Sequence, residues 1–196
     1  MDKKIFGIAL NANNIYKIHD YIMEESSFGK KKIVVVNVGT DKIIADAFGP
    51  LLGQMLKEKK YKHIITYGNL HHNVNCRNLE KISEKISEKH KDDLIIATDA
   101  CFLRTSDINH KSYKKIYFTN KPLYPGQGVG KKNPPIGNMK ITYNVLTVDE
   151  ISNLLKGTIK IAEIYSKCKE TVKLFDMLEN TLKEMDKDEI YNSLYR

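Results

Sequence analysis

The fold is decided by the stretch Asn37-Val38-Gly39-Thr40-Asp41-Lys42-Ile43-Ile44-Ala45-Asp46-Ala47-Phe48-Gly49-Pro50. Before it runs the β-branched segment 32–36, which is typical of a strand buried on both faces of a parallel sheet. After it, residues 51–57 have the apolar spacing of a helix. Such strand-to-helix crossings lie at the carboxyl edge of an α/β sheet, where ligands and catalytic groups gather. The stretch therefore predicts that Asp46 lies at that edge.

Two interpretations of Asp46 stay open at this point. A carboxylate at the sheet edge can take part in chemistry. However, Asp is also a favoured N-cap residue, and Asp46 directly precedes the predicted helix. The stretch alone does not decide between a chemical and a capping role.

Hydrophobic periodicity predicts further strands and helices on both sides of this crossing. Predicted helices cover Ile15 to Met23, about Asn78 to His90, the segment from Asp149 onward, and roughly Thr171 to Met185. Predicted strands cover residues 62–67, 94–98, 116–118 and 139–145. Alternating strands and helices indicate an α/β protein with a mostly parallel sheet. The 196 residues fit one domain, 1–196, that is large enough to bury a full core.

The composition indicates a cytoplasmic chain with reduced thiols. The sequence has no apolar stretch of membrane-spanning length, and the segment after Met1 lacks the features of a signal peptide. Cys76, Cys101 and Cys168 are odd in number and far apart, with no Cys-x-x-Cys pair for zinc or for redox chemistry.

The net charge is +8, from 32 Lys and Arg against 24 Asp and Glu, and it could attract nucleic acid or an acidic protein. The lysines are nevertheless scattered and mostly flank strands or helices. The sequence shows no interleaving of basic and aromatic residues of the kind that stacks bases. Direct nucleic-acid binding is therefore the least favoured hypothesis. A DNA affinity that falls steeply with added salt would support nucleic-acid binding.

A second carboxylate, Asp99, closes the predicted strand 94–98. If that strand neighbours segment 32–36, the edge rule brings Asp99 close to Asp46. Two close carboxyl groups cannot both ionise easily, so one can act as acid while the other acts as base. Arg104 follows shortly after Asp99, where it could hold a carboxylate ionised, stabilise an oxyanion, or form an ordinary surface ion pair.

The segment 122–137 is rich in Pro and Gly and too long for a simple turn. Its glycine pattern, Gly126-x-Gly128-x-Gly130, does not follow a strong buried strand or open a convincing helix, so a phosphate-binding role is weakly supported. Lys131 and Lys132 could meet an acidic substrate or belong to a solvated turn. We expect residues 125–137 to line a cleft and to move when no ligand is bound.

Four blocks of the sequence, taken together, resemble a known family. They are Gly39-Thr40 with 46–50, Ala97-Thr98-Asp99-Ala100 with Arg104, then 125–130, and 134–137. These blocks resemble, in order, the YyaC-type sporulation proteins, which are similar to the germination protease of spore-forming bacteria and to hydrogenase-maturation peptidases. The resemblance covers the chain from about Lys31 to Thr147.

The resemblance implies a three-layer α/β/α, phosphorylase/hydrolase-like fold and a catalytic pair at Asp46 and Asp99. It implies no metal and no cofactor, location in the cytoplasm of the spore or forespore, and small acid-soluble spore proteins as substrates. From the loops near the pair we expect these substrate contacts: Arg104, Asn69, Pro125, Gly126, Gly128 and Lys131. The chain is much shorter than the germination protease, so substrate identity does not carry over directly. A nickel site would need a histidine beside the carboxylates, and the sequence has no matching motif. His71 or His72 could approach the pair, or each could be an ordinary loop histidine.

The leading hypothesis is a cytoplasmic endopeptidase of sporulation or germination that uses the aspartate pair on a peptide or small acidic protein. The alternative is a non-catalytic sporulation protein of the same fold that binds a peptide or an acidic partner. Two carboxylates that repel each other favour the enzyme, because a binding module has no need of them.

Overall fold

The computed structural model describes residues 7–27, 31–103, 113–126, 133–147 and 159–194. Its strands are β1 (Gly7–Ala9), β2 (Ile33–Asn37), β3 (Ile64–Tyr67), β4 (Leu94–Leu103), β5 (Ile116–Thr119) and β6 (Met139–Thr147). They form one sheet in the order β1-β5-β6-β4-β2-β3. Strands β6, β4, β2 and β3 are parallel, whereas β5 and β1 extend the sheet antiparallel. The predicted α/β class with a mostly parallel sheet is confirmed.

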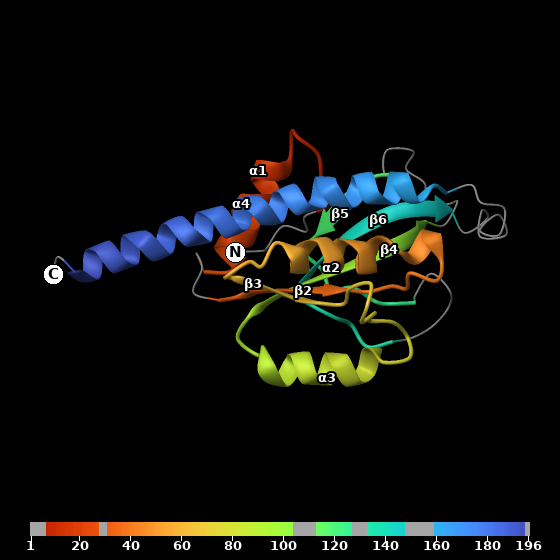
Figure 1. Cartoon of the computed structure of the whole chain (residues 1–196), viewed down its shortest axis with the longest axis horizontal. Coiled ribbons are helices and arrows are strands. Elements are labelled where there is room, and N and C mark those ends of the chain that lie inside the picture. Colours follow the sequence, from red (N-terminus) through yellow and green to blue (C-terminus); the bar gives the residue numbers. More distant parts are fainter. Residues whose placement is uncertain (1–6, 28–30, 104–112, 127–132, 148–158, 195–196) are drawn as a thin grey trace.

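Helices cover both faces of this sheet (Figure 1). The helices are α1 (Ile15–Glu25), α2 (Phe48–Glu58), α3 (Leu79–Lys89) and α4 (Ile161–Leu194). One face carries α1, α2 and α4, and α3 lies on the other (Figure 1). The expected three-layer α/β/α arrangement is therefore present.

The residues of β2 explain why both faces are covered. All five residues of this strand are buried, and successive side chains point to opposite faces. Ile33 and Val35 belong to the larger core, under α1, α2 and α4. Val34 and Val36 belong to a smaller core that includes Leu79 of α3. The side chains of this uninterrupted β-branched run are therefore buried on both faces of the sheet, in two separate cores.

Two elements differ from the expectations. Strand β1 was not predicted, because three residues give too short a pattern. The two predicted C-terminal helices are wrong as separate elements, since α4 is one helix of 34 residues. No Gly or Pro interrupts residues 161–194, and buried Ile164, Cys168 and Val172 continue the apolar stripe at intervals of four. Residues 148–158, where the first of these helices was expected to begin, lie outside the described residues.

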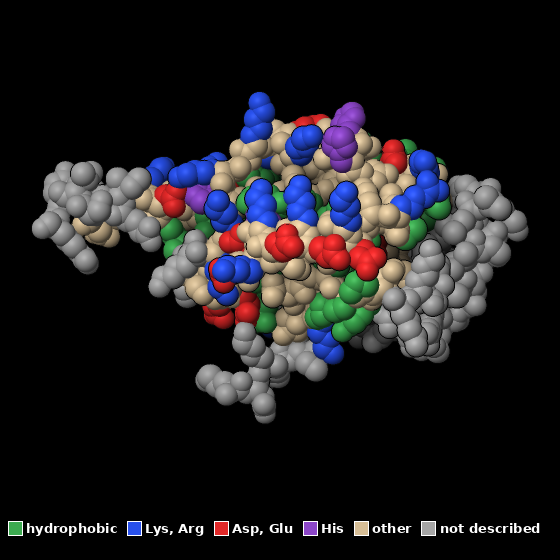
Figure 2. Space-filling model, turned by 90° about the horizontal axis from the view of Figure 1, so that it is seen from below, with side chains coloured by type: hydrophobic (Ala, Val, Ile, Leu, Met, Phe, Trp, Pro, Cys, Tyr) green, Lys and Arg blue, Asp and Glu red, His purple; other side chains and the backbone are tan. Residues whose placement is uncertain are grey.

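The face that carries α3 has a regular pattern of charge. Figure 2 shows this face with a row of basic side chains beside a row of acidic ones. Helix α3 supplies exposed Lys81, Lys85 and Lys89 at intervals of four, and Glu80, Glu84 and Glu88 alongside them. In the described part of the chain, no helix is long and apolar enough to cross a membrane.

Candidate active site

Buried Asn37, the last residue of β2, joins the carboxyl ends of three strands. Its side-chain N–H group donates to the Thr66 hydroxyl at 2.9 Å and to the Tyr67 carbonyl oxygen at 2.9 Å. Its side-chain oxygen accepts the hydroxyl of Thr98 on β4 at 2.9 Å. Because these groups are satisfied, the polar side chain is accommodated in the core. The hydrogen bonds hold β3, β2 and β4 in register at the edge where the aspartates lie.

The turn after β2 brings Asp46 back to this edge. The Thr40 backbone N–H donates to the Asp46 carboxylate at 2.9 Å and to the Asp46 carbonyl oxygen at 3.2 Å. Gly39 has a φ of +136°, and a Cβ there would lie 2.3 Å from the Asp46 carbonyl oxygen. Glycine is therefore required for the turn to close in this way.

The capping interpretation of Asp46 is wrong. Asp46 ends a short 3-10 turn, Ile44–Asp46, and the N-cap residue of α2 is Ala47, with no side-chain cap. The Asp46 carboxylate instead accepts the backbone N–H of Thr40.

Helix α2 approaches the sheet edge closely because two of its residues lack side chains. A Cβ on Gly49 would lie 1.9 Å from the Val38 carbonyl oxygen, and one on Gly53 would lie 1.9 Å from the Gly68 carbonyl oxygen. These contacts fix the start of α2 against the strand ends. The position of Asp46, two residues before the helix, is fixed with it.

Asp99 lies on β4, one residue after Thr98, the last residue of β4 that pairs with β2. Asp99 itself pairs with Thr142 on β6. Strand β4 therefore neighbours β2, as the edge rule required. Asp46 and Asp99 lie close enough to interact electrostatically. Burial raises the pKa of Asp46 to about 6, against the opposing effect of the Thr40 N–H. Burial and then the Asp46 charge raise the pKa of Asp99 well above its ordinary value, and a hydrogen bond from the Ala100 backbone opposes this.

Lys140 and Cys101 are further members of this cluster that the sequence analysis missed. Lys140 pairs with Ala97, and Cys101 follows Asp99 by two residues, so these side chains share one face of the sheet. The Lys140 charge partly offsets the rise in the pKa of Asp99. Burial and the Asp99 charge raise the pKa of the Cys101 thiol. Consequently Cys101 is a poor thiolate nucleophile.

A signal for this part of the site was present in the sequence. Along β6, polar Lys140, Thr142 and Asn144 alternate with apolar residues. Alternation with a period of two indicates that one face of the strand is not an ordinary apolar core. Thr142 and Asn144 are both buried, so this polar face lies inside the protein.

The predicted substrate contacts fall into two groups. Arg104, Gly128 and Lys131 lie outside the described residues. The described members are Asn69, Pro125 and Gly126.

Asn69 and Pro125 organise their loops. The side-chain oxygen of buried Asn69 accepts the backbone N–H groups of His71 and His72 at 2.9 and 3.0 Å. The carbonyl oxygen of buried Pro125 accepts a hydrogen bond from the Asn133 side chain at 2.8 Å. Direct contact of Asn69, Pro125 and Gly126 with a substrate stays a prediction.

His71 and His72 are exposed in the loop after β3. Among the described residues, no group of three or more His, Cys, Asp or Glu side chains is placed to hold a metal ion. Metal-independent chemistry at the aspartates also stays a prediction.

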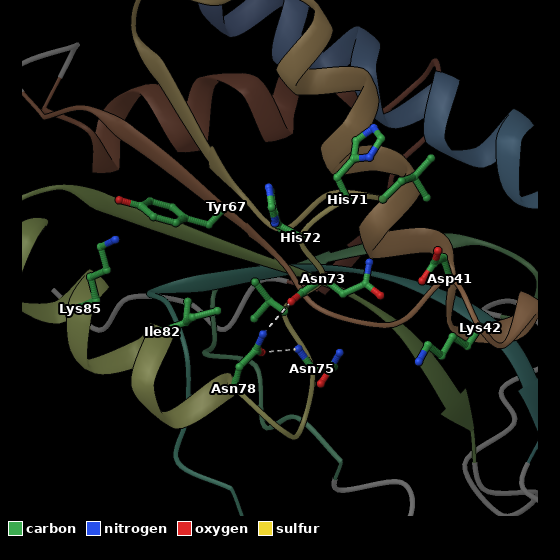
Figure 3. Close-up of a pocket in the computed structure, with 13 residues that line it drawn as sticks. Asp41, Lys42, Tyr67, His71, His72, Asn73, Asn75, Asn78, Ile82 and Lys85 are labelled. Atoms are coloured by element: carbon green, nitrogen blue, oxygen red, sulfur yellow. Dashed lines mark hydrogen bonds between the residues drawn. The ribbon is translucent and has the colours of Figure 1, made fainter.

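A pocket of about 690 Å³ lies beside the turn that carries Asp46, and we call it the β3–α3 groove (Figure 3). It is lined by Asp41, Lys42, Tyr67, Gly68, Leu70, His71, His72, Asn73, Val74, Asn75, Asn78, Ile82 and Lys85. Asn73 connects the groove to the turn, because its side-chain oxygen accepts the Thr40 hydroxyl at 3.3 Å. The volume is in the range of ligand-binding sites.

Comparison with solved structures finds a hydrogenase maturation protease, HycI, of Thermococcus kodakarensis KOD1. It is 18% identical in sequence, with a TM-score of 0.46, and the match covers 83% of this chain and 99% of that one. At this score, the fold assignment rests on the sheet order and layers of this chain itself.

A curated relative is the uncharacterized protein YyaC of Bacillus subtilis (strain 168). It is 37% identical over 111 residues, which make up 57% of this chain. The match spans about half of the relative's length, 52%. The family model described as "Protein of unknown function (DUF1256)" matches residues 8–174. The chain therefore belongs to the DUF1256 family and is similar to YyaC.

Proposed function

We propose that this protein is a peptidase that hydrolyses peptide bonds with Asp46 and Asp99. One observation carries the proposal: the carboxyl group of Asp46, from the turn after β2, interacts with that of Asp99 on the neighbouring strand β4, and the pKa of each is raised. Perturbed carboxyl pairs of this kind are characteristic of acid–base catalysis.

The two pKa directions assign the two roles. Asp99 carries the stronger rise, so it holds the proton near neutral pH and acts as the acid. Asp46, with a pKa of about 6, is mostly ionised at pH 7 and acts as the base. The Thr40 N–H that donates to the Asp46 carboxylate at 2.9 Å orients it and favours its charged form.

Hydrolysis then follows a balanced proton sequence. Asp46 removes a proton from a water molecule as the water oxygen attacks the scissile carbonyl carbon, and Asp99 protonates the carbonyl oxygen. In the second step the C–N bond breaks, the leaving nitrogen takes the proton from Asp46, and Asp99 recovers its proton from the hydroxyl of the intermediate. Both carboxyl groups return to their starting states, so no other co-reactant is consumed.

The biological setting proposed here is the cytoplasm of a spore or forespore, with small acid-soluble spore proteins as candidate substrates. The sequence blocks around both aspartates, which resemble the YyaC-type sporulation proteins, support this setting.

The test is incubation of the purified chain with a spore-protein extract, followed by mass spectrometry of new peptide termini. We expect termini that accumulate with time and are absent with Asp99→Asn. No time-dependent termini, or the same termini with the variant, would contradict the proposal.

The second candidate is a binding protein of the same fold that does not cleave its partner. The β3–α3 groove favours it, because its volume is in the range of ligand-binding sites and neither aspartate lines it. Capture of an intact spore protein by the chain, without cleavage over hours, would favour this candidate.

A further inference from the structure

The wall of the β3–α3 groove is a network of asparagines that bond to one another. The Asn78 side chain donates to the Asn73 carbonyl oxygen at 2.8 Å and accepts the Asn75 backbone N–H at 2.9 Å (Figure 3). The Asn73 side chain donates to the Asn69 carbonyl oxygen at 2.9 Å. These amide groups stabilise the loop after β3 and are occupied in doing so. Recognition of a ligand therefore depends mainly on other side chains of the groove.

The charged side chains that line the groove are mostly basic. Lys42 and Lys85 are exposed, and within the described part of the chain neither forms an ion pair. His71 and His72 add two ring N–H groups that can donate hydrogen bonds to an anion. Asp41 is the single acidic residue in the lining. The groove therefore favours an anionic ligand.

The aromatic content of the groove favours a peptide over a nucleic acid. Tyr67 is the only aromatic residue among the lining side chains apart from the two histidines, and its hydroxyl is hydrogen-bonded to the His90 ring at 2.9 Å. Binding of single strands usually depends on several aromatic side chains that stack on successive bases. An acidic peptide needs only the separated positive charges that are present.

The groove leads to the Asp46 turn. The Thr40 backbone N–H contacts the Asp46 carboxylate, and the Thr40 hydroxyl contacts Asn73 in the groove wall. The next two residues, Asp41 and Lys42, line the groove themselves. In Figure 3, Lys42 lies towards one end of the groove and Lys85 of α3 towards the other. A ligand that spans the groove thus ends beside the turn that holds the Asp46 carboxylate.

We propose that the β3–α3 groove binds an extended acidic segment of the substrate, with acidic side chains against Lys42 and Lys85, and directs the adjoining peptide bond to Asp46 and Asp99. The binding step stands on the groove, whereas the cleavage step rests on the proposed peptidase function. The groove is thus a specificity site separate from the reacting groups.

The test measures binding and cleavage separately. The probes are a fluorescently labelled ten-residue Gly–Ser peptide with three adjacent Glu residues, the same peptide with three Gln residues, and a labelled ten-nucleotide oligothymidylate. Binding is measured by anisotropy with Asp99→Asn, which keeps every groove residue and does not consume the probe. From two exposed ion pairs, we expect the Glu peptide to bind about 3- to 10-fold more tightly than the Gln peptide at low salt. The preference should shrink as salt is added.

Matched double variants in the Asp99→Asn background locate the site. Lys42→Gln with Lys85→Gln should remove the preference for the Glu peptide. Lys57→Gln with Lys81→Gln removes the same charge from exposed positions outside the groove and should keep the preference. Equal affinity for the two peptides, or loss of the preference in both double variants, would overturn the proposal. The proposal would also be overturned if the oligothymidylate bound more tightly than the Glu peptide and only Lys42→Gln with Lys85→Gln removed that binding.

Cleavage assays in which Asp99 is retained distinguish failure of the groove proposal from failure of the proposed peptidase function. If the Glu preference depends on Lys42 and Lys85 but the chain cleaves no spore protein, the groove is supported and the peptidase is refuted. If spore proteins are cleaved and Lys42→Gln with Lys85→Gln leaves kcat/KM unchanged on every one, the peptidase is supported and the groove is refuted.

Discussion

Replacing Asp46 by Asn should stabilise the protein at alkaline pH and have little effect at acidic pH. The pKa of Asp46 rises from its ordinary 3.8 to about 6 on folding, mainly through burial. Between these values the folded protein binds more protons than the unfolded chain, so the free energy of unfolding falls as pH rises. The destabilisation is absent below pH 3.8 and complete above pH about 6. Asn removes it because its side chain carries no charge.

The magnitude follows from the shift. About two pKa units at about 1.4 kcal/mol each give an upper limit of about 3 kcal/mol. Asp46 is partly exposed, so screening by solvent reduces the expected gain to about 1–2 kcal/mol. For a chain of this size that corresponds to about 2–8 °C in Tm. The Asn side-chain oxygen can still accept the Thr40 N–H, so the turn after β2 should persist.

The assay is thermal unfolding of wild type and Asp46→Asn, followed by circular dichroism at pH 4, 6 and 8. Asp92→Asn is the matched control, because Asp92 is exposed at a loop away from the site and should leave Tm unchanged at each pH. A Tm gain for Asp46→Asn that appears between pH 4 and pH 8 supports a destabilising, buried Asp46 charge. A Tm at pH 8 equal to or below that of wild type would refute it.

Three further predictions concern the same edge of the sheet. Carboxyl NMR titration should show the Asp46–Asp99 pair as two coupled steps that both lie above the pKa of a free aspartate. Lys140→Met should raise the upper step, because the Lys140 charge lowers the pKa of Asp99, and two ordinary aspartate titrations would contradict this. Peptidase activity should survive EDTA, and recovery of lost activity by a stoichiometric metal would disprove metal independence. Gly49→Ala should cost several kcal/mol of unfolding free energy, because its Cβ would lie 1.9 Å from the Val38 carbonyl oxygen, and a wild-type denaturation midpoint would show that α2 can move away.

The sequence predicted the part of the fold that local patterns determine. The run 33–36 indicated a strand covered on both faces, and two cores do cover it. Strand β4 was predicted to end at residue 98 but continues to Leu103, because pairing with β6 supports residues beyond the apolar run. Tertiary pairing therefore set the length of that strand, which a local pattern does not contain.

The candidate site was predictable only in its two carboxylates. Asp46 and Asp99 each come after an apolar run in the sequence, and parallel pairing of β2 with β4 brings them close enough to interact. Lys140 joins them through the β4–β6 register, which joins segments far apart in the sequence. The hydrogen bond from the Thr40 N–H to the Asp46 carboxylate depends on the geometry of the turn after β2. The residue type of Asp46 does not predict this contact, so the sequence left helix capping open.

If Asp46 and Asp99 together hydrolyse peptide bonds, cleavage requires both carboxyl groups. The most direct measurement is the initial rate of cleavage of one spore-extract substrate by wild type, Asp46→Asn and Asp99→Asn at equal concentration and pH 7, with thermal unfolding confirming that each chain is folded. We expect either folded variant to lose at least about 100-fold in kcat/KM, the low end for removal of a general acid or base. Wild-type cleavage by either folded variant would contradict it.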